Sequence, residues 1–236
     1  INHQILLSNE KQFDNATSPY FMLKALRQLF IEHHITTLKP SEVVVTHSNH
    51  LFSLVPVPLF SKGALAQYLK LNAKLLATDE ITYDELPQLD LVSVYVPFTN
   101  INNYLFDLFG SFEFKHVSTV LLDTLAKQHK SNKEICYAHI TKNTVEVTVF
   151  RQKKLLFYNQ FNYATAEDFL YYILFVYEQL NLDVETVKLK LFGQVEEGDK
   201  NFELCYTYIR KVKVFIPENA FENTFAEGTF DLTLLS

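Results

Sequence analysis

The sequence is poor in glycine: its 236 residues include five, where average usage of about 7% would give roughly 16. Loops that cradle phosphate need clustered glycines, because the backbone must reach positive φ and approach the anion without a Cβ in the way. The five glycines are too widely spaced for a G-x-G-x-x-G fingerprint. Gly193 and Gly198 have the Walker-A spacing, but Asp199-Lys200-Asn201 follows where Lys-Ser/Thr is required. Both common glycine-rich nucleotide motifs are therefore excluded.

Cysteines and long apolar runs are also scarce. Cys136 and Cys205 are the two cysteines, and both have apolar neighbours, which is typical of buried, reduced thiols and not of a disulfide framework. The longest apolar run is the nine residues from Phe169 to Tyr177, well short of the ~18–20 that cross a membrane. No signal peptide is recognised, and we expect a cytoplasmic protein without a membrane span.

The composition is that of a folded chain, with 48% hydrophobic residues and a formal net charge of −6. Disorder requires low hydrophobicity and high net charge, so it is excluded. The 27 acidic residues outnumber the 21 Lys and Arg, which argues against a nucleic-acid partner because phosphates are neutralised by a basic face. The length permits one large domain or two small ones.

The second half of the chain is predicted to have the order β-β-β-α-β-α-β. Three β-prone segments at about 134–140, 144–150 and 154–162 are separated by short polar turns and predict an antiparallel meander. Thr165 then caps a helix whose first turn carries Glu167 and Asp168. A strand at 186–192, a helix at 200–210 and a strand at 211–216 follow.

The first half repeats part of this order. The segment from Gln4 to Asn9 leads into a helix at about 20–34, as the segment from Lys154 to Asn159 leads into the helix after Thr165, and a strand at 42–46 follows. This half therefore begins at its third strand and lacks its opening hairpin. Residues 51–90 have no counterpart and are interpreted as an insertion with a helix at about 64–76 and an acidic loop. A buried strand at 91–96, a helix at 100–109, a strand at 112–117 and a helix at 119–128 complete it. We expect domains at 1–131 and 132–236.

Two stretches resemble known families. Val94-Tyr95-Val96-Pro97 and the segment from His116 to Leu122 look like the close of the first domain in actin-like proteins of pilus assembly and cell division. Residues 155–172 closely resemble an uncharacterised bacterial domain family with the actin-like ATPase fold. The resemblance implies an α/β fold of two tandem ribonuclease H-like halves with mixed sheets. It transfers no activity, because the family has none assigned.

The resemblance also implies where a nucleotide would bind. Actin-like ATPases carry a second-half hairpin that reads roughly Asp-hydrophobic-Gly-x-x-Thr-Thr. Over residues 138–145 it puts His139 at the acid, Thr141 at the glycine, and Asn143 and Thr144 at the end of the turn. Imidazole does not replace a carboxylate around Mg²⁺, which prefers hard oxygen ligands. The adenosine segment would fall at 191–194, where Gly193-Gln194 retains one glycine of two. These residues are interpreted as a vestigial nucleotide cleft.

We therefore expect a non-catalytic protein-interaction or scaffold module with no catalytic residues, no metal and no cofactor, and with an unidentified protein partner. The alternative is a divergent nucleotide-binding protein, weak ATPase or kinase-like phosphotransferase, which would need ATP and Mg²⁺. A nuclease is least supported, since Glu134 and Glu146 are the only carboxylates on the two strands that would hold two metals.

The remaining polar residues favour structural interpretations. His47 and His50 are expected in a solvated turn, and Asp84 in a solvated loop. Ser118 has no identifiable base. The 21 Phe and 13 Tyr are best explained by a core, but an aromatic docking surface stays open as an alternative. Its candidate members are Tyr171, Tyr206 and Tyr208, or the run Phe221, Phe225 and Phe230.

Overall fold

The computed structural model describes residues 6–13, 17–70 and 75–216. Its contacts divide the chain into an N-terminal unit up to Val120 and a C-terminal unit from Leu121 onward. The division falls inside helix α4 (Val117–Gln128), whose first turn contacts the strands that precede it.

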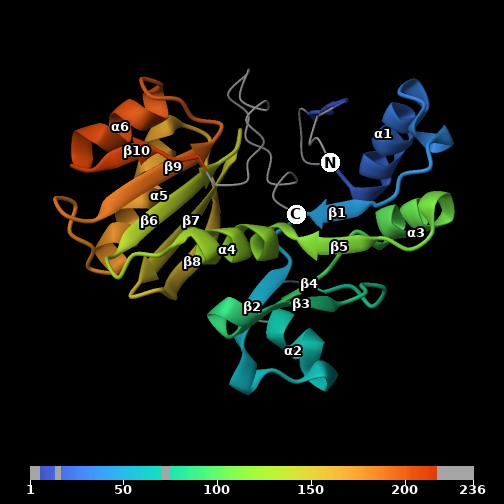
Figure 1. The fold of residues 1–236 in the computed structure, drawn as a ribbon, viewed down its shortest axis with the longest axis horizontal. Coiled ribbons are helices and arrows are strands. Elements are labelled where there is room, and N and C mark those ends of the chain that lie inside the picture. The colour runs from blue at the N-terminus through green and yellow to red at the C-terminus, as the bar shows by residue number, and fades with distance from the viewer. Residues whose placement is uncertain (1–5, 14–16, 71–74, 217–236) are drawn as a thin grey trace. The chain divides into compact units, whose positions relative to one another are not determined.

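The C-terminal unit is built on a mixed five-stranded sheet (Figure 1). Its strands are β6 (Ile135–Ile140), β7 (Thr144–Arg151), β8 (Lys154–Asn162), β9 (Lys188–Gly193) and β10 (Val212–Val214), in the spatial order β10-β9-β6-β7-β8. Strands β6, β7 and β8 form an antiparallel meander, while β9 runs parallel to β6 and β10 parallel to β9. The predicted meander and the predicted element order of this half are confirmed.

Helices α5 (Ala166–Gln179) and α6 (Lys200–Tyr208) pack on one face of this sheet. Thr165 begins α5 with a capping box: its hydroxyl accepts from the Asp168 amide at 3.1 Å, and the Asp168 carboxylate accepts from the Thr165 amide at 3.1 Å. The predicted cap is thus confirmed. Alternate residues of β6, including the 0% exposed Cys136, meet both helices in one apolar core.

The N-terminal unit begins with α1 (Pro19–Glu32) and a short 3₁₀ turn, η1 (Ile35–Thr37). Strands β1 (Val44–His47) and β5 (Glu113–His116) pair in parallel, and α3 (Thr99–Phe109) packs against α1 through Phe30, Tyr104 and Phe109. The helices predicted at 20–34, 100–109 and 119–128 are confirmed within a few residues.

A separate antiparallel sheet fills the segment interpreted as an insertion. Its strands are β2 (Phe52–Pro56), β4 (Leu91–Tyr95) and β3 (Thr82–Leu86), in the order β2-β4-β3, with α2 (Leu65–Leu69) packed on Val55, Val92 and Val94. Short 3₁₀ turns η2 (Val57–Leu59), η3 (Lys62–Ala64) and η4 (Pro87–Leu89) connect these elements. The strand expected to close the first half is buried, but it is the central strand of this sheet. The expected end of α2 lies partly in residues 71–74, outside the described residues.

The strand predicted at residues 4–9 is wrong for residues 6–9, the part that the structure describes. Residues 6–9 form no strand, and the side chain of Leu6 is 90% exposed. Their apolar letters match those of β8, but β8 pairs with β7 along its whole length, and residues 6–9 have no strand beside them among the described residues. Propensity for β structure depends on a neighbour to pack against, so the letters alone do not make a strand.

Candidate functional site

The six candidate residues lie together at one end of the C-terminal sheet. Strands β6 and β9 are parallel, so their carboxyl ends meet: His139 is opposite Phe192 and Ile140 is opposite Gly193. Beyond the strands, the Gln194 amide donates to the Ile140 carbonyl at 2.7 Å. Thr141, Asn143 and Thr144 form the turn between β6 and β7 at the same end. The structure thus brings the sequence-predicted residues into one place.

The turn between β6 and β7 uses its own polar groups. The Thr141 amide donates to the Thr144 carbonyl at 2.9 Å, and the Thr144 amide donates to the Thr141 hydroxyl at 3.2 Å. The two threonine hydroxyls are 2.7 Å apart. Tyr163 closes the turn from outside, donating its hydroxyl to the Thr141 carbonyl at 2.6 Å and its amide to the Asn143 carbonyl at 3.0 Å. The two threonine amides are therefore not available to an anion.

Gly193 has a local structural explanation. Its φ is +92°, a conformation that residues with a Cβ rarely adopt. A Cβ built at this position would lie 2.2 Å from the Ile140 carbonyl oxygen and 2.9 Å from the His139 ring. The close approach of β9 to β6 thus requires glycine here, and the surviving glycine of the expected pair is accounted for without a ligand.

His139 is the first member of a polar row that crosses three strands, and both His139 and its neighbour Glu146 are buried. Its Nδ1 lies 2.8 Å from Oε2 of Glu146 on β7, and Oε1 of Glu146 accepts from the Tyr158 hydroxyl of β8 at 2.5 Å. An ionised carboxylate only accepts, so Nδ1 carries the hydrogen. Burial, and then the neighbouring Glu146 charge, raise the pKa of the Tyr158 hydroxyl. Sequence reasoning noticed Glu146 only as an isolated carboxylate and missed Tyr158.

The opposite nitrogen of the same ring is unusual. His139 is 4% exposed, yet within the described part of the chain its Nε2 has no hydrogen-bond partner. Buried polar atoms are nearly always paired, so this atom is a place where a water or a ligand group would be satisfied. A chemical role for the ring would have to use this nitrogen, since Nδ1 is committed to Glu146.

A second polar cluster lies in the N-terminal unit, where the sequence led us to expect solvated charge. Asp84 is on β3, and its carboxylate accepts from the Thr119 hydroxyl at 2.7 Å, the His116 amide at 2.9 Å and the Tyr95 hydroxyl at 3.1 Å. Burial outweighs these bonds and raises the pKa of Asp84. The expectation of a solvated loop is wrong, because Asp84 anchors β3 to β4 and to the first turn of α4.

Ser118 does have a histidine neighbour. Its hydroxyl is 2.7 Å from Nδ1 of His116 and 3.2 Å from the hydroxyl of Ser93, while Nε2 of His116 lies 3.1 Å from the Asn49 carbonyl. A serine at this distance from a base has the spacing of an activated nucleophile. However, Ser118, His116 and Ser93 are all 0% exposed, so no substrate reaches the hydroxyl. The cluster positions the start of α4.

The other predicted residues are placed as follows. His47 is 2% exposed, with Nε2 2.9 Å from Asn102 Oδ1, so the solvated turn expected there is wrong for His47, although His50 is exposed. Burial lowers the pKa of His47. Tyr171, Tyr206 and Tyr208 are each more than half exposed. The run Phe221, Phe225 and Phe230 lies outside the described residues.

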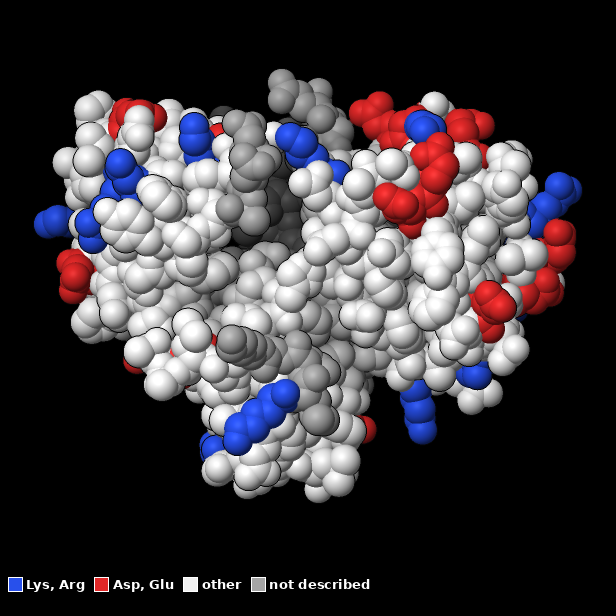
Figure 2. Space-filling model, turned by 180° about the vertical axis from the view of Figure 1, so that it is seen from behind, with Lys and Arg blue, Asp and Glu red and all other residues white. Residues whose placement is uncertain are grey.

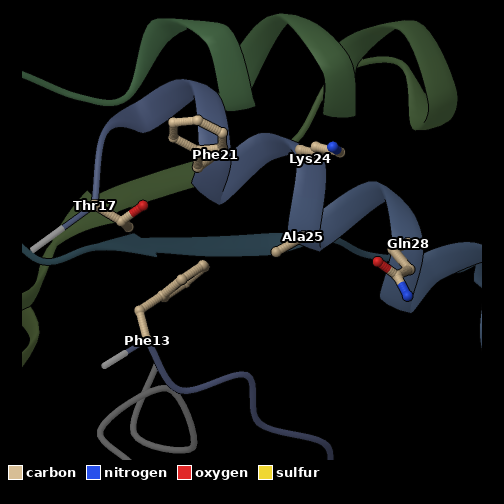
Figure 3. Close-up of a pocket in the computed structure, with 6 residues that line it drawn as sticks. All are labelled: Phe13, Thr17, Phe21, Lys24, Ala25 and Gln28. Carbon is tan, nitrogen blue, oxygen red and sulfur yellow. The ribbon is translucent and has the colours of Figure 1, made fainter. Parts of the chain in front are cut away.

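A shallow open groove of about 300 Å³ runs along α1 (Figure 3). Phe13 lies across it from the helix, and Phe21, Lys24, Ala25 and Gln28 line the helix side. The lining offers one cation and no carboxylate, and it contains none of the residues of the polar clusters above.

Neither a metal site nor a membrane span is found in the described part of the chain. Residues 6–13, 17–70 and 75–216 contain no group of three His, Cys, Asp or Glu side chains that could hold a metal ion. None of their helices is long and apolar enough to cross a bilayer.

Comparison with known proteins gives the fold and the family. A Bacteroides thetaiotaomicron protein described as having an actin-like ATPase fold and unknown function superposes with a TM-score of 0.79 at 21% identity, covering 90% of this chain and 81% of that one. A structure of the PilM-PilN type IV pilus biogenesis complex superposes with a TM-score of 0.56 at 11% identity, covering 92% and 83%. A search of curated protein sequences gives no significant match. Residues 1–212 match the family described as a protein of unknown function (DUF3822). The chain belongs to this family, and its fold is that of the actin-like ATPases.

Proposed function

We propose that this protein is a non-catalytic actin-like domain that acts as a protein-interaction or scaffold module. The observation that carries the proposal is the closed turn between β6 and β7. In the place where an actin-like ATPase would present a glycine turn to phosphate, Thr141 and Thr144 bond to each other and Tyr163 covers the turn carbonyls. His139 takes the position of the magnesium-orienting acid, and its Nδ1 is held by Glu146.

The proposal includes two tandem ribonuclease H-like halves. The parallel pair β1 and β5 then corresponds to β9 and β10, and the 14-residue helix α1 corresponds to the 14-residue helix α5. Helix α5 buries six residues against its sheet, whereas α1 fully buries none. Helix α1 instead packs against α3 through Phe30, Tyr104 and Phe109.

Two further observations support an interaction function in a bacterial cytoplasm. The buried thiols Cys136 and Cys205 are free, and burial raises the pKa of both, so neither is a reactive nucleophile. The PilM of the similar structure is found in complex with PilN, which is a precedent for a protein partner on this fold.

Isothermal titration with Mg-ATP and with ADP tests the proposal. The turn geometry predicts no binding at millimolar nucleotide. A dissociation constant below the millimolar range for either nucleotide would contradict it.

The alternative is a divergent nucleotide-binding protein or weak phosphotransferase that uses ATP and Mg²⁺. The unpartnered Nε2 of His139 favours it, because the buried His139 ring lies next to Gly193 at the end of β9, and the turn formed by Thr141, Asn143 and Thr144 follows at the end of β6. A ligand that binds only the native state must raise the melting temperature. Millimolar nucleotide with Mg²⁺ should therefore raise the melting temperature of the wild type and not of His139→Ala. An unchanged wild-type melting temperature would eliminate the alternative.

A further inference from the structure

Strands β9 and β10 lie next to each other in the C-terminal sheet (Figure 1), and four lysines lie on them or directly before β10. Leu189 and Leu191 of β9 and Val212 of β10 point into the core. Side chains alternate along a strand, so the lysines between and before these residues occupy the opposite face. We call Lys188, Lys190, Lys211 and Lys213 the lysine ladder.

The lysines of the two neighbouring segments lie opposite each other in pairs. Lys213 is the Cα partner of Lys190, and the Lys211 carbonyl accepts from the Leu189 amide at 2.9 Å, which places Lys211 beside Lys188. Neighbouring strands are about 4.8 Å apart, and residues two apart in one strand are separated by about 7 Å. The ladder is thus a rectangle of four positive charges.

This arrangement is unfavourable for the isolated chain. Like charges directly opposite each other destabilise a sheet. Burial and the Lys188 charge lower the pKa of Lys190. None of the four lysines forms an ion pair with a carboxylate of residues 6–13, 17–70 or 75–216. Lys211 does have an acidic neighbour: the pKa of Asp183 is lowered by hydrogen bonds from the Glu185 amide and the Thr186 hydroxyl and then by the Lys211 charge, and the Lys211 Nζ donates to the Thr186 carbonyl at 3.4 Å. Glu167, Asp168 and Glu203 lie in the first turns of α5 and α6, which cover the other face of the sheet. Figure 2 shows Asp and Glu side chains in groups on the side seen from behind, with Lys and Arg among them.

Lysines on an edge strand can also serve simply to prevent sheets from joining. That role explains Lys213 on β10 and Lys211 directly before it, because β10 is the edge strand of this sheet among the described residues. It does not explain Lys188 and Lys190, because β9 is paired on both sides by β6 and β10. Lys190 is further held in place, with its Nζ 4.4 Å from the centre of the Phe215 ring and 5.1 Å from that of Tyr137. A lysine fixed over two rings is a preorganised charge.

We infer that the lysine ladder is a docking surface for an acidic segment of a partner protein, bound as an extended strand along β10. The inference rests on the proposed interaction function and names the surface that performs it.

The edge of β10 supplies the second element of recognition. The Lys211 carbonyl and the Phe215 amide bond to β9. In a pair of parallel strands the residues that bond to the neighbour alternate with residues that do not, so the amides and carbonyls of Val212 and Val214 point away from β9. An added strand would bond to these groups, as in other cases of strand addition to a sheet edge. Its carboxylates at every second position would then share the face of Lys211 and Lys213. A peptide is favoured over a nucleic acid because the outward amides and carbonyls of Val212 and Val214 can pair with a polypeptide backbone, whereas a phosphodiester backbone has no amide to offer them.

The test measures binding of a synthetic peptide of four Glu-Thr repeats to the full chain by fluorescence anisotropy, with four Gln-Thr repeats as the uncharged control. The ladder variant is Lys188→Gln/Lys211→Gln/Lys213→Gln, which spares the packed Lys190. The matched variant is Lys11→Gln/Lys39→Gln/Lys70→Gln, three exposed lysines of the N-terminal unit with the same loss of charge.

The wild type is expected to bind the Glu peptide and not the Gln peptide, more weakly at high salt. The ladder variant should lose about 10-fold or more in affinity, and the matched variant less than about 2-fold. No binding of the Glu peptide, an equal loss in both variants, or tighter binding of long-chain polyphosphate or duplex DNA would overturn the inference. Nucleotide titration on the same samples separates the two proposals: if Mg-ATP also fails to bind, only the ladder is wrong, whereas nucleotide binding contradicts the proposed function itself.

Discussion

Glycine at position 193 is explained either by the close packing of β9 on β6 or by a bound ligand. The free energy of unfolding of Gly193→Ala tests the packing explanation. The added methyl group would lie 2.2 Å from the Ile140 carbonyl oxygen, and the backbone φ of +92° would be strained by any side chain. Holding a non-glycine residue in such a conformation costs about 1–3 kcal/mol. Forcing an extra carbon into a packed site costs about 1–3 kcal/mol more. We therefore expect Gly193→Ala to lower the free energy of unfolding by about 2–6 kcal/mol.

Gly198→Ala is the matched control. Gly198 has a φ of +95°, nearly the same as Gly193, but nothing lies within 4 Å of the Cβ position. This variant should lose only the conformational part, about 1–3 kcal/mol. Urea denaturation followed by far-ultraviolet circular dichroism gives both values, with each transition fitted separately if the two units unfold independently. Equal losses of unfolding free energy in the two variants would refute the clash with β6, and the glycine at position 193 would then need another explanation, such as a bound ligand.

Three other outcomes are expected from the same measurement. Asp84→Ala leaves the donors of Tyr95, His116 and Thr119 unpaired and should lower the free energy of unfolding by about 2–5 kcal/mol. Asp84→Asn keeps one acceptor oxygen and should lower it clearly less. Similar losses of unfolding free energy in the two variants would show that these hydrogen bonds do not stabilise the fold. The pKa of Asp84 is raised in the folded protein, so its contribution is present in full below the unfolded pKa of about 3.9 and is lost as the pH rises through the raised folded pKa. The stability of the wild type relative to Asp84→Asn should therefore fall from pH 4 towards neutrality, and a rise would contradict the direction of the shift. Thr165→Ala removes the cap of α5 and should cost about 1 kcal/mol, with Thr165→Ser as the variant that retains the bond; no loss in the alanine variant would count against the capping box.

Local signals in the sequence were sufficient for the C-terminal sheet and its helices. Thr165 and Asp168 are three residues apart, so the capping box that begins α5 is visible in the letters. The meander of β6, β7 and β8 has short turns, and its pairing follows from chain connectivity. The same reasoning failed at residues 6–9, because these apolar residues have no neighbouring strand to pair with in the described part of the chain.

The polar clusters were not predictable, because each depends on register between segments far apart in the chain. Asp84 meets the His116 amide 32 residues later and the Thr119 hydroxyl 35 residues later, and nothing near Asp84 in the sequence marks it as buried. Tyr158 meets Glu146 only because a register shift next to Phe150 sets the pairing of β7 with β8. At the candidate site, the resemblance to actin-like proteins predicted which residues gather, whereas the bonds that close the turn needed coordinates.

We expect that no nucleotide binds at the ends of β6 and β9. A crystal structure of the protein soaked with ADP and Mg²⁺ tests this expectation. It should show no nucleotide density, with the Tyr163 hydroxyl still bonded to the Thr141 carbonyl and the Gln194 amide to the Ile140 carbonyl. Ordered ADP with phosphate oxygens bonded to the amides of residues 141–144, or with a ring nitrogen bonded to His139, would contradict it.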